Sequence, residues 1–108
     1  MLKKKYVKSR DVCKVAFVIP KKELPKDIEV KKVTLVGDFN DWENNSTPMK
    51  KNSKGDFRVE IDLQTSSEYQ FRYLINGKQW YNDWAADEYR PNDQGGDNCV
   101  VKTLAKPA

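Results

Sequence analysis

Apolar and polar residues alternate with a period of two along much of the chain. From Asp56 to Leu63 every second residue is apolar and the residues between them are charged, a pattern typical of a half-buried β-strand. The segment from Glu68 to Ile75 repeats this pattern with aromatic residues at alternate positions. The segment from Val12 to Ile19 is apolar on both faces, so we expect a strand that is covered on both sides.

Turn residues separate further short strands, which we expect at Val30 to Val36, Gln79 to Tyr81 and Asn98 to Leu104. The dipeptide Asn76-Gly77 is the strongest short signal for a β-hairpin, because a type I′ turn needs positive φ at both central residues. No segment shows helical periodicity over more than about two turns. The pattern therefore predicts an all-β fold, an immunoglobulin-like antiparallel β-sandwich of about seven or eight short strands.

The length is that of a single domain. A chain of 108 residues is too short for an α/β barrel, which needs about 200 residues. We predict one β-sandwich over residues 11–104, preceded by a basic tail at residues 1–10 and followed by a C-terminal tail at residues 105–108. The sequence is compatible with a stand-alone module and with a part of a larger protein.

Charge is distributed unevenly. Residues 1–35 contain eleven Lys and Arg against four Asp and Glu, a balance of +7, whereas residues 36–108 contain nine against twelve, a balance of −3. A basic segment of this kind is typical of a tail that binds nucleic acid or an acidic partner, and also of an ordinary solubilising tail. We favour the solubilising tail and do not expect nucleic acid as a partner, since the aromatic candidates lie in the acidic part of the chain.

Neither a leader nor a membrane segment is expected. The apolar stretch from Val12 to Ile19 is interrupted by Lys14, and it is too short for a signal sequence or a membrane span. We therefore expect a cytoplasmic protein without membrane partners. We also expect the thiols of Cys13 and Cys99 to be free and buried in the first and last predicted strands.

The composition excludes several kinds of catalytic site. The chain has no histidine, which excludes Ser-His-Asp and Cys-His nucleophiles and histidine-ligated metals. A glycosidase needs two carboxylates facing each other across a cleft, and the acids on the strands fall on outward faces with nothing opposite. The acidic loop at residues 82–97 is a conceivable calcium site, but we interpret it as a solvated loop with Asx turns. We predict no catalytic residue, metal or cofactor.

Three tryptophans lie in or beside polar turns. Trp42 follows the turn-like run from Gly37 to Asp41, Trp80 follows the Asn76-Gly77 hairpin, and Trp84 lies just beyond it. An exposed indole beside polar groups can stack on the apolar face of a sugar ring. For Trp42 and Trp80, the periodicity alone supports such a platform and a place at the end of the core equally.

Three sequence motifs occur together in this order: the run from Val33 to Trp42, the run from Tyr69 to Trp80, and the run from Asp97 to Val101. Over residues 31–101 the chain resembles the family-48 carbohydrate-binding modules, also called isoamylase or branching-enzyme N-terminal (early-set) domains. The glycogen-binding domain of the AMP-activated kinase β subunit is a close relative of these modules. The resemblance implies an early-set β-sandwich that binds α-1,4-glucans such as glycogen and starch.

The resemblance also implies residues of a sugar site. Two tryptophans clamp the sugar in the glycogen-binding members, and these match Trp42 and Trp80. A lysine that bonds glucan hydroxyls in those members is matched by Arg72, which keeps the charge but changes its reach. Trp84 stands where many members have proline, so it either extends the platform or packs against the fold.

A further sugar contact in these members is an asparagine before the last strand. Its match is Asp97 or Asn98, depending on the alignment of the Gly95-Gly96 loop. If the match is Asp97, a hydrogen-bond acceptor is kept and a donor is lost.

The function implied is a non-catalytic α-1,4-glucan binding module that resembles the N-terminal domain of glycoside hydrolase family 13 enzymes. Its expected ligand is a glucan oligosaccharide or polysaccharide, and its candidate protein partners are a glucan-metabolising enzyme and a kinase-type complex. The alternative is a protein-interaction or regulatory β-sandwich with a lost sugar site, because many enzyme members use the domain as a spacer. Exposure of Trp42 and Trp80 on one surface would favour the glucan module.

Overall fold

The alternating segments form antiparallel β-strands in the computed structural model, which describes residues 1–7 and 9–104. Two short 3-10 turns interrupt them, η1 (Lys21–Glu23) and η2 (Asp38–Asn40). The strands are β1 (Leu2–Val7), β2 (Val12–Ile19), β3 (Val33–Gly37), β4 (Lys50–Lys51), β5 (Phe57–Gln64), β6 (Glu68–Ile75), β7 (Gln79–Tyr81), β8 (Glu88–Pro91) and β9 (Asp97–Lys102).

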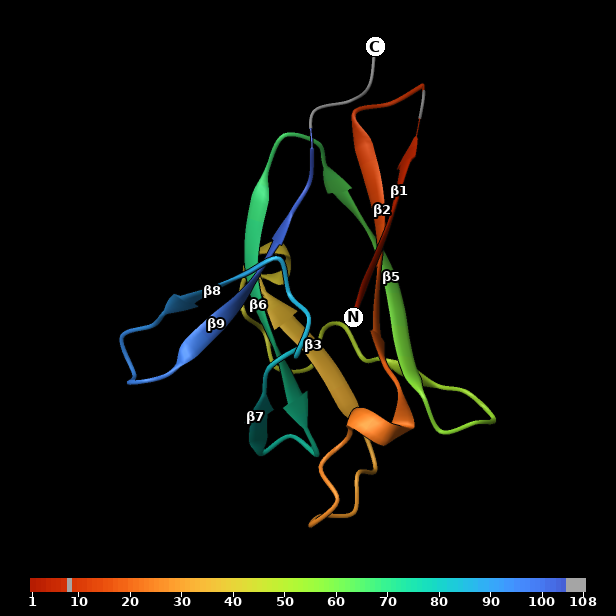
Figure 1. Cartoon of the computed structure of the whole chain (residues 1–108), viewed down its shortest axis with the longest axis vertical. Coiled ribbons are helices and arrows are strands. Elements are labelled where there is room, and N and C mark those ends of the chain that lie inside the picture. The colour runs from red at the N-terminus through yellow and green to blue at the C-terminus, as the bar shows by residue number, and fades with distance from the viewer. Residues whose placement is uncertain (8, 105–108) are drawn as a thin grey trace.

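The strands are arranged in two sheets. The first has the order β1-β2-β5-β4, and the second has the order β3-β6-β9-β8 with β7 also paired to β6. Figure 1 shows the two sheets as separate layers, with β1, β2 and β5 in one and β3, β6, β8 and β9 in the other. This arrangement confirms the predicted all-β antiparallel sandwich.

The inner faces of the sheets meet in a core of aromatic side chains. Phe71 lies between Phe17 and Tyr73, with its ring centroid 5.0 Å from that of Phe17 and 5.7 Å from that of Tyr73, both in edge-on geometry. Edge-on packing is the arrangement that aromatic rings prefer. Phe39 of η2 extends the cluster, with its centroid 5.7 Å from that of Phe17. The core therefore fixes the position of the turn that follows β3.

The outer faces of the two sheets differ. On the first sheet the outward side chains of β5 are exposed and charged, and Asp62 pairs with Lys14 at 3.6 Å. On the second sheet the outward residues Val36, Leu74 and Val100 are buried, as are their inward neighbours. Loops and side chains therefore cover this part of the outer face, whereas Trp80 of β7 on the same face stays exposed.

Strand β1 differs from the expectation that residues 1–10 form a tail. It pairs with β2 along its whole length, from Leu2 opposite Phe17 to Val7 opposite Val12. Leu2 and Tyr6 pack against the core. Between Leu2 and Tyr6, the inward position is taken by Lys4, which breaks the apolar alternation. The sequence pattern therefore does not reveal this strand within its run of lysines. With β1, β4 and β8 included, the described residues form more strands than the sequence predicts. The predicted C-terminal tail at residues 105–108 lies outside the described residues.

Both cysteines are free and fully buried, as expected. Burial raises the pKa of the Cys99 thiol to about 11, so this thiol is protonated and unreactive at neutral pH. Within residues 1–7 and 9–104, neither 3-10 turn is long or apolar enough to be a membrane-spanning helix.

Candidate functional site

A groove of about 360 Å³ lies on the outer face of the second sheet. Its residues come from the turn after η2, from β6, β7 and β9, and from the β8–β9 hairpin. They are Trp42, Asn44, Arg72, Trp80, Asn92, Asp93, Gln94 and Asn98. Four of the side chains singled out from the sequence therefore meet here: Trp42, Arg72, Trp80 and Asn98.

Strand register explains why three of these residues share a face. Arg72 lies between Phe71 and Tyr73, which point into the core, so its own side chain points outward. Trp80 lies opposite Leu74, two residues further along the same face. Asn98 precedes the buried Cys99. The period of two thus places all three side chains on the outer face.

Arg72 occupies the position where β6 changes its neighbour. Along one edge of β6, β9 pairs as far as Phe71 and β7 pairs from Tyr73 onward. Asn82 bridges the gap, since its Oδ1 accepts from Arg72 Nε at 2.8 Å and its Nδ2 donates to the carbonyl of Asp97 at 2.9 Å. Between β7 and β9, hydrogen bonds of the Asn82 side chain thus take the place of strand pairing.

The guanidinium of Arg72 lies over the indole of Trp80, with Cζ 5.6 Å from the ring centroid. This is a cation–π contact, and together with the Asn82 hydrogen bond it fixes the orientation of both side chains. Only Nε is used by the described part of the protein. Arg72 lines the groove, and its two terminal nitrogens keep donors that no described group of the protein uses.

Trp42 is held by the turn that precedes it, and the turn depends on a glycine. A Cβ on Gly37 would lie 2.6 Å from the carbonyl oxygen of Gln70 and 2.9 Å from Cβ of Phe71, so only glycine fits. Asn40 then closes the turn, because its Oδ1 accepts from Gly37 N at 3.0 Å and its Nδ2 donates to the carbonyl of Leu35 at 2.9 Å.

The backbone reverses sharply at Asp41 and Trp42, whose φ angles are 56° and 57°. Consecutive left-handed residues other than glycine are strained, and such strain often occurs at functional sites. Asp38 holds the indole of Trp42 in place. One oxygen of the Asp38 carboxylate accepts from Trp42 Nε1 at 2.8 Å, and the other accepts from the backbone N–H of Gln70 at 2.7 Å. Trp42 is thus anchored to β6 through Asp38.

Asn98 is positioned by its neighbours on the hairpin and on β6. Its Oδ1 accepts from Asn92 Nδ2 at 3.2 Å, and its Nδ2 donates to Gln70 Oε1 at 3.0 Å. Asn92 Oδ1 in turn accepts from the backbone N–H groups of Gln94 and Gly96, which is the Asx-turn chemistry expected for this loop. The sequence indicates the turn but gives no sign that Asn92 and Gln94 line the groove.

Two candidate residues lie away from the groove. Trp84 is 42% exposed, in the loop between β7 and β8, and does not line it. The Asp97 side chain is exposed and does not line it either, although its carbonyl accepts from Asn82. Of the alternatives Asp97 and Asn98, only Asn98 faces the groove, together with Trp80, which is 38% exposed.

The carboxylates of the 82–97 loop point to different partners. Asp83 is fully buried, accepts from the Tyr73 hydroxyl at 2.7 Å, and forms an ion pair with the α-ammonium group of Met1. Asp87 pairs with Lys4 at 2.6 Å. In the part of the chain that the structure describes, no three carboxylates or thiols are arranged to hold a metal ion.

The chain was compared with models of known protein families. A family model described as the glycogen recognition site of AMP-activated protein kinase matches residues 26–106, a range that includes every residue of the groove. No curated protein matches the chain.

Proposed function

Since the chain belongs to the family of the glycogen recognition site of AMP-activated protein kinase, we propose that it is a non-catalytic module that binds α-1,4-glucans such as glycogen and starch. The observation that carries this proposal is the groove, in which the exposed Trp80 meets the half-buried Trp42, Arg72 and Asn98. Two indoles with amide and guanidinium groups between them match the apolar faces and the hydroxyls of a glucan.

In this proposal the indoles of Trp42 and Trp80 stack on glucose rings of one curved glucan segment. The terminal nitrogens of Arg72 donate to sugar hydroxyls, and the amide of Asn98 donates and accepts. Covering one face of an indole contributes roughly 1–2 kcal/mol after polar costs, so we expect a dissociation constant roughly between millimolar and micromolar.

The chemistry of the groove supports a binding role without catalysis. Glycoside hydrolysis requires a pair of carboxylates on opposite sides of the scissile bond. Asp93 is the only acid among the described residues that line the groove. The chain also contains no histidine. The groove therefore offers stacking surfaces and hydrogen bonds but no acid–base pair.

The resemblance to N-terminal domains of glycoside hydrolase family 13 enzymes extends the proposal to partners. We propose that the module holds a glucan-metabolising enzyme or a kinase-type complex at a glucan. The support is the shared order of the motifs that end at Trp42 and Trp80.

The test is a titration with maltoheptaose, followed by tryptophan fluorescence and by amide NMR shifts. We expect saturable shifts at the groove residues and a loss of affinity of about tenfold or more in Trp80→Ala. Trp84→Ala is the matched control, because Trp84 is equally exposed but lies outside the groove, and we expect it to retain the parent affinity.

Two results would contradict the proposal. One is an affinity that is unchanged in Trp80→Ala, which would place the glucan elsewhere. The other is no saturable response at several millimolar ligand, which would favour a protein-interaction module with a lost sugar site.

A further inference from the structure

A second pocket, of about 800 Å³, lies where η1 follows β2 and where the β4–β5 hairpin turns. It shares no lining residue with the groove. We call it the lysine basin and define it by five lysines and four apolar residues: Lys21, Lys22, Lys26, Lys51 and Lys54, with Leu24, Ile28, Val30 and Phe57.

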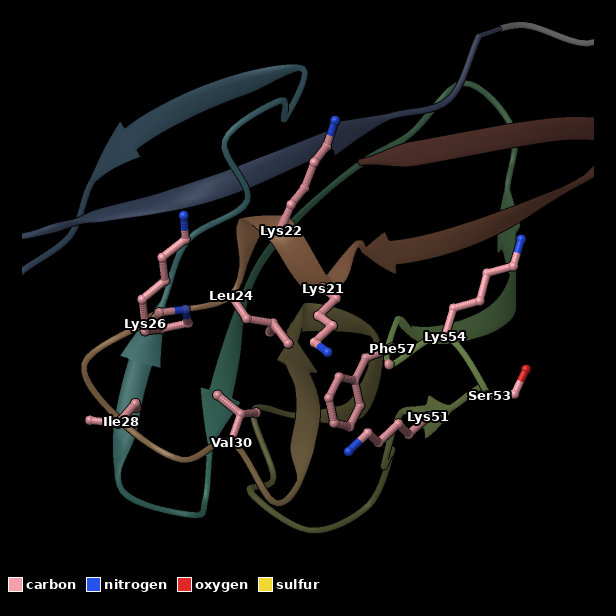
Figure 2. Close-up of a pocket in the computed structure, with 12 residues that line it drawn as sticks. Lys21, Lys22, Leu24, Lys26, Ile28, Val30, Lys51, Ser53, Lys54 and Phe57 are labelled. Carbon is pink, nitrogen blue, oxygen red and sulfur yellow. The ribbon is translucent and has the colours of Figure 1, made fainter.

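The middle of the lysine basin is apolar. Phe57 lies at the bottom and is 2% exposed, while Leu24 and Val30 are half-buried and pack against the core. Figure 2 shows these three side chains grouped in the middle of the pocket, with Lys22 and Lys26 extending outward around them. A ligand that fills the basin would therefore bury apolar groups in the centre and meet cations at the rim.

One carboxylate acts on the cations at the rim, because Asp56, just before β5, interacts electrostatically with Lys54. Within residues 1–7 and 9–104 none of the five lysines forms an ion pair, and no carboxylate is among the described residues that line the basin. Elsewhere on the surface Lys4, Lys14 and Lys102 are each paired with an acid. A recess whose described lining residues include five lysines and no acid attracts an anionic partner.

The walls of the basin are built by specific contacts. Asp56, just before β5, accepts from the backbone N–H of Lys21 at 2.9 Å and ties η1 to the hairpin. Asn52 shapes the hairpin turn, since its Oδ1 accepts from the N–H groups of Lys54 and Asp56. On the other side, the Tyr81 hydroxyl donates to the carbonyl of Glu23. A recess held in this way binds without a large cost of ordering.

We propose that the lysine basin docks an acidic segment of a partner protein, with an apolar side chain on the floor and carboxylates on the lysines. Charge complementarity carries this choice, because the described residues that line the basin include five lysines and no acid, and its floor is apolar. Nucleic acid fits less well: bases stack on exposed aromatic faces, whereas the basin's one aromatic residue among those described, Phe57, is buried.

The test uses a short synthetic peptide in which leucines alternate with glutamates, titrated into the full chain and followed by amide NMR shifts. We expect shifts at the residues of the basin. Lys51→Gln with Lys54→Gln should weaken binding by about fivefold to tenfold, because each lost rim charge removes a modest attraction. Lys3→Gln with Lys5→Gln is the matched control, since it removes the same charge from exposed positions on β1, and we expect a change below about twofold.

Two further peptides separate the parts of the proposal. A peptide with serine for leucine keeps the charge, and one with glutamine for glutamate keeps the apolar groups; we expect both to bind at least about fivefold more weakly than the parent peptide. Equal binding of the serine peptide would overturn the proposal, and so would equal losses in the two lysine variants. Tighter binding of a single-stranded oligonucleotide, or self-association of the chain through the basin, would overturn it as well. Trp80→Ala should leave peptide binding unchanged, so the outcome is independent of the glucan proposal.

Discussion

The groove and the lysine basin are two recesses of one sandwich that are built by different means. Three side chains of the groove lie on strands and share a face by register, namely Arg72, Trp80 and Asn98, and the others come from the turn after η2 and the β8–β9 hairpin. The lysine basin lies between a loop and a hairpin, joined by the contact of Lys21 with Asp56. Strand register fixes Trp80 and the turn after η2 fixes Trp42, whereas the basin has long cations on flexible stems.

This difference in construction indicates which property of a ligand each recess recognises. Stacking and neutral hydrogen bonds act at short range and depend on shape. Charges on lysine act over a Debye length of about 8 Å at physiological salt and depend little on shape. The groove is therefore suited to selecting a ligand by geometry, and the basin to attracting one by charge.

The largest effect is expected from a substitution that destabilises the fold on which both the groove and the lysine basin depend. In Gly37→Ala the added Cβ meets the backbone at Gln70 and Cβ of Phe71 at 2.6 and 2.9 Å, so we expect a loss of about 1–3 kcal/mol in the free energy of unfolding. Urea unfolding measures it. Gly96→Ala is the control, because its nearest contact is 3.7 Å away; an equal loss in both variants would contradict the packing argument.

A smaller effect is expected where only the groove is changed. Asp38→Ala removes the acceptor of Trp42 Nε1 and of the Gln70 N–H, so we expect about threefold to tenfold weaker glucan binding. Peptide binding to the lysine basin should stay the same. The indole N–H resonance of Trp42 reports the lost hydrogen bond directly, and Asp38→Asn, which keeps one acceptor, should restore part of the affinity. A resonance that does not move would show that Asp38 has no positioning role.

The smallest effect is expected at the wall of the basin, under acid. The backbone N–H of Lys21, and then Asn52, hold the pKa of Asp56 below its ordinary value. A carboxylate with a lowered pKa stabilises the fold above its unfolded pKa of about 3.9 and loses that contribution as pH falls through its folded pKa. We therefore expect the Lys21 amide resonance to shift only below about pH 4. The shift should be absent in Asp56→Asn; its persistence there would assign it to another group.

The sequence predicts the strands with clean alternation well and the hidden strands poorly. Strand β6, with alternating residues, and strand β2, apolar on both faces, have the expected bounds, and β5 begins and ends one residue later than expected. Strand β1 is missed because Lys4 takes an inward position and is paired with Asp87, far along the chain. A charge that is neutralised by a distant residue leaves no mark in the local pattern.

The groove and the lysine basin also differ in how far the sequence reveals their residues. Trp42 and Trp80 stand out in the sequence as aromatics in polar turns, and the structure brings them to one groove. The lysine basin does not stand out, because the contact between η1 and the hairpin joins Lys21 and Lys22 to Lys51 and Lys54. Read along the chain, the first two belong to a basic segment and the last two to a polar loop. Only the fold makes them one surface.

Trp80 lies directly opposite Leu74, which is 2% exposed on the outward face of β6. The indole therefore shields a buried leucine as well as facing the groove. In a descendant that no longer binds the ligand, selection would still favour a bulky apolar residue at position 80. A small residue there would expose Leu74 to water. Asn98 also has a role in the fold, because its amide joins Asn92 of the hairpin to Gln70 of β6. Among descendants of this fold, a bulky apolar residue kept at position 80 would therefore not by itself show that the groove is still used.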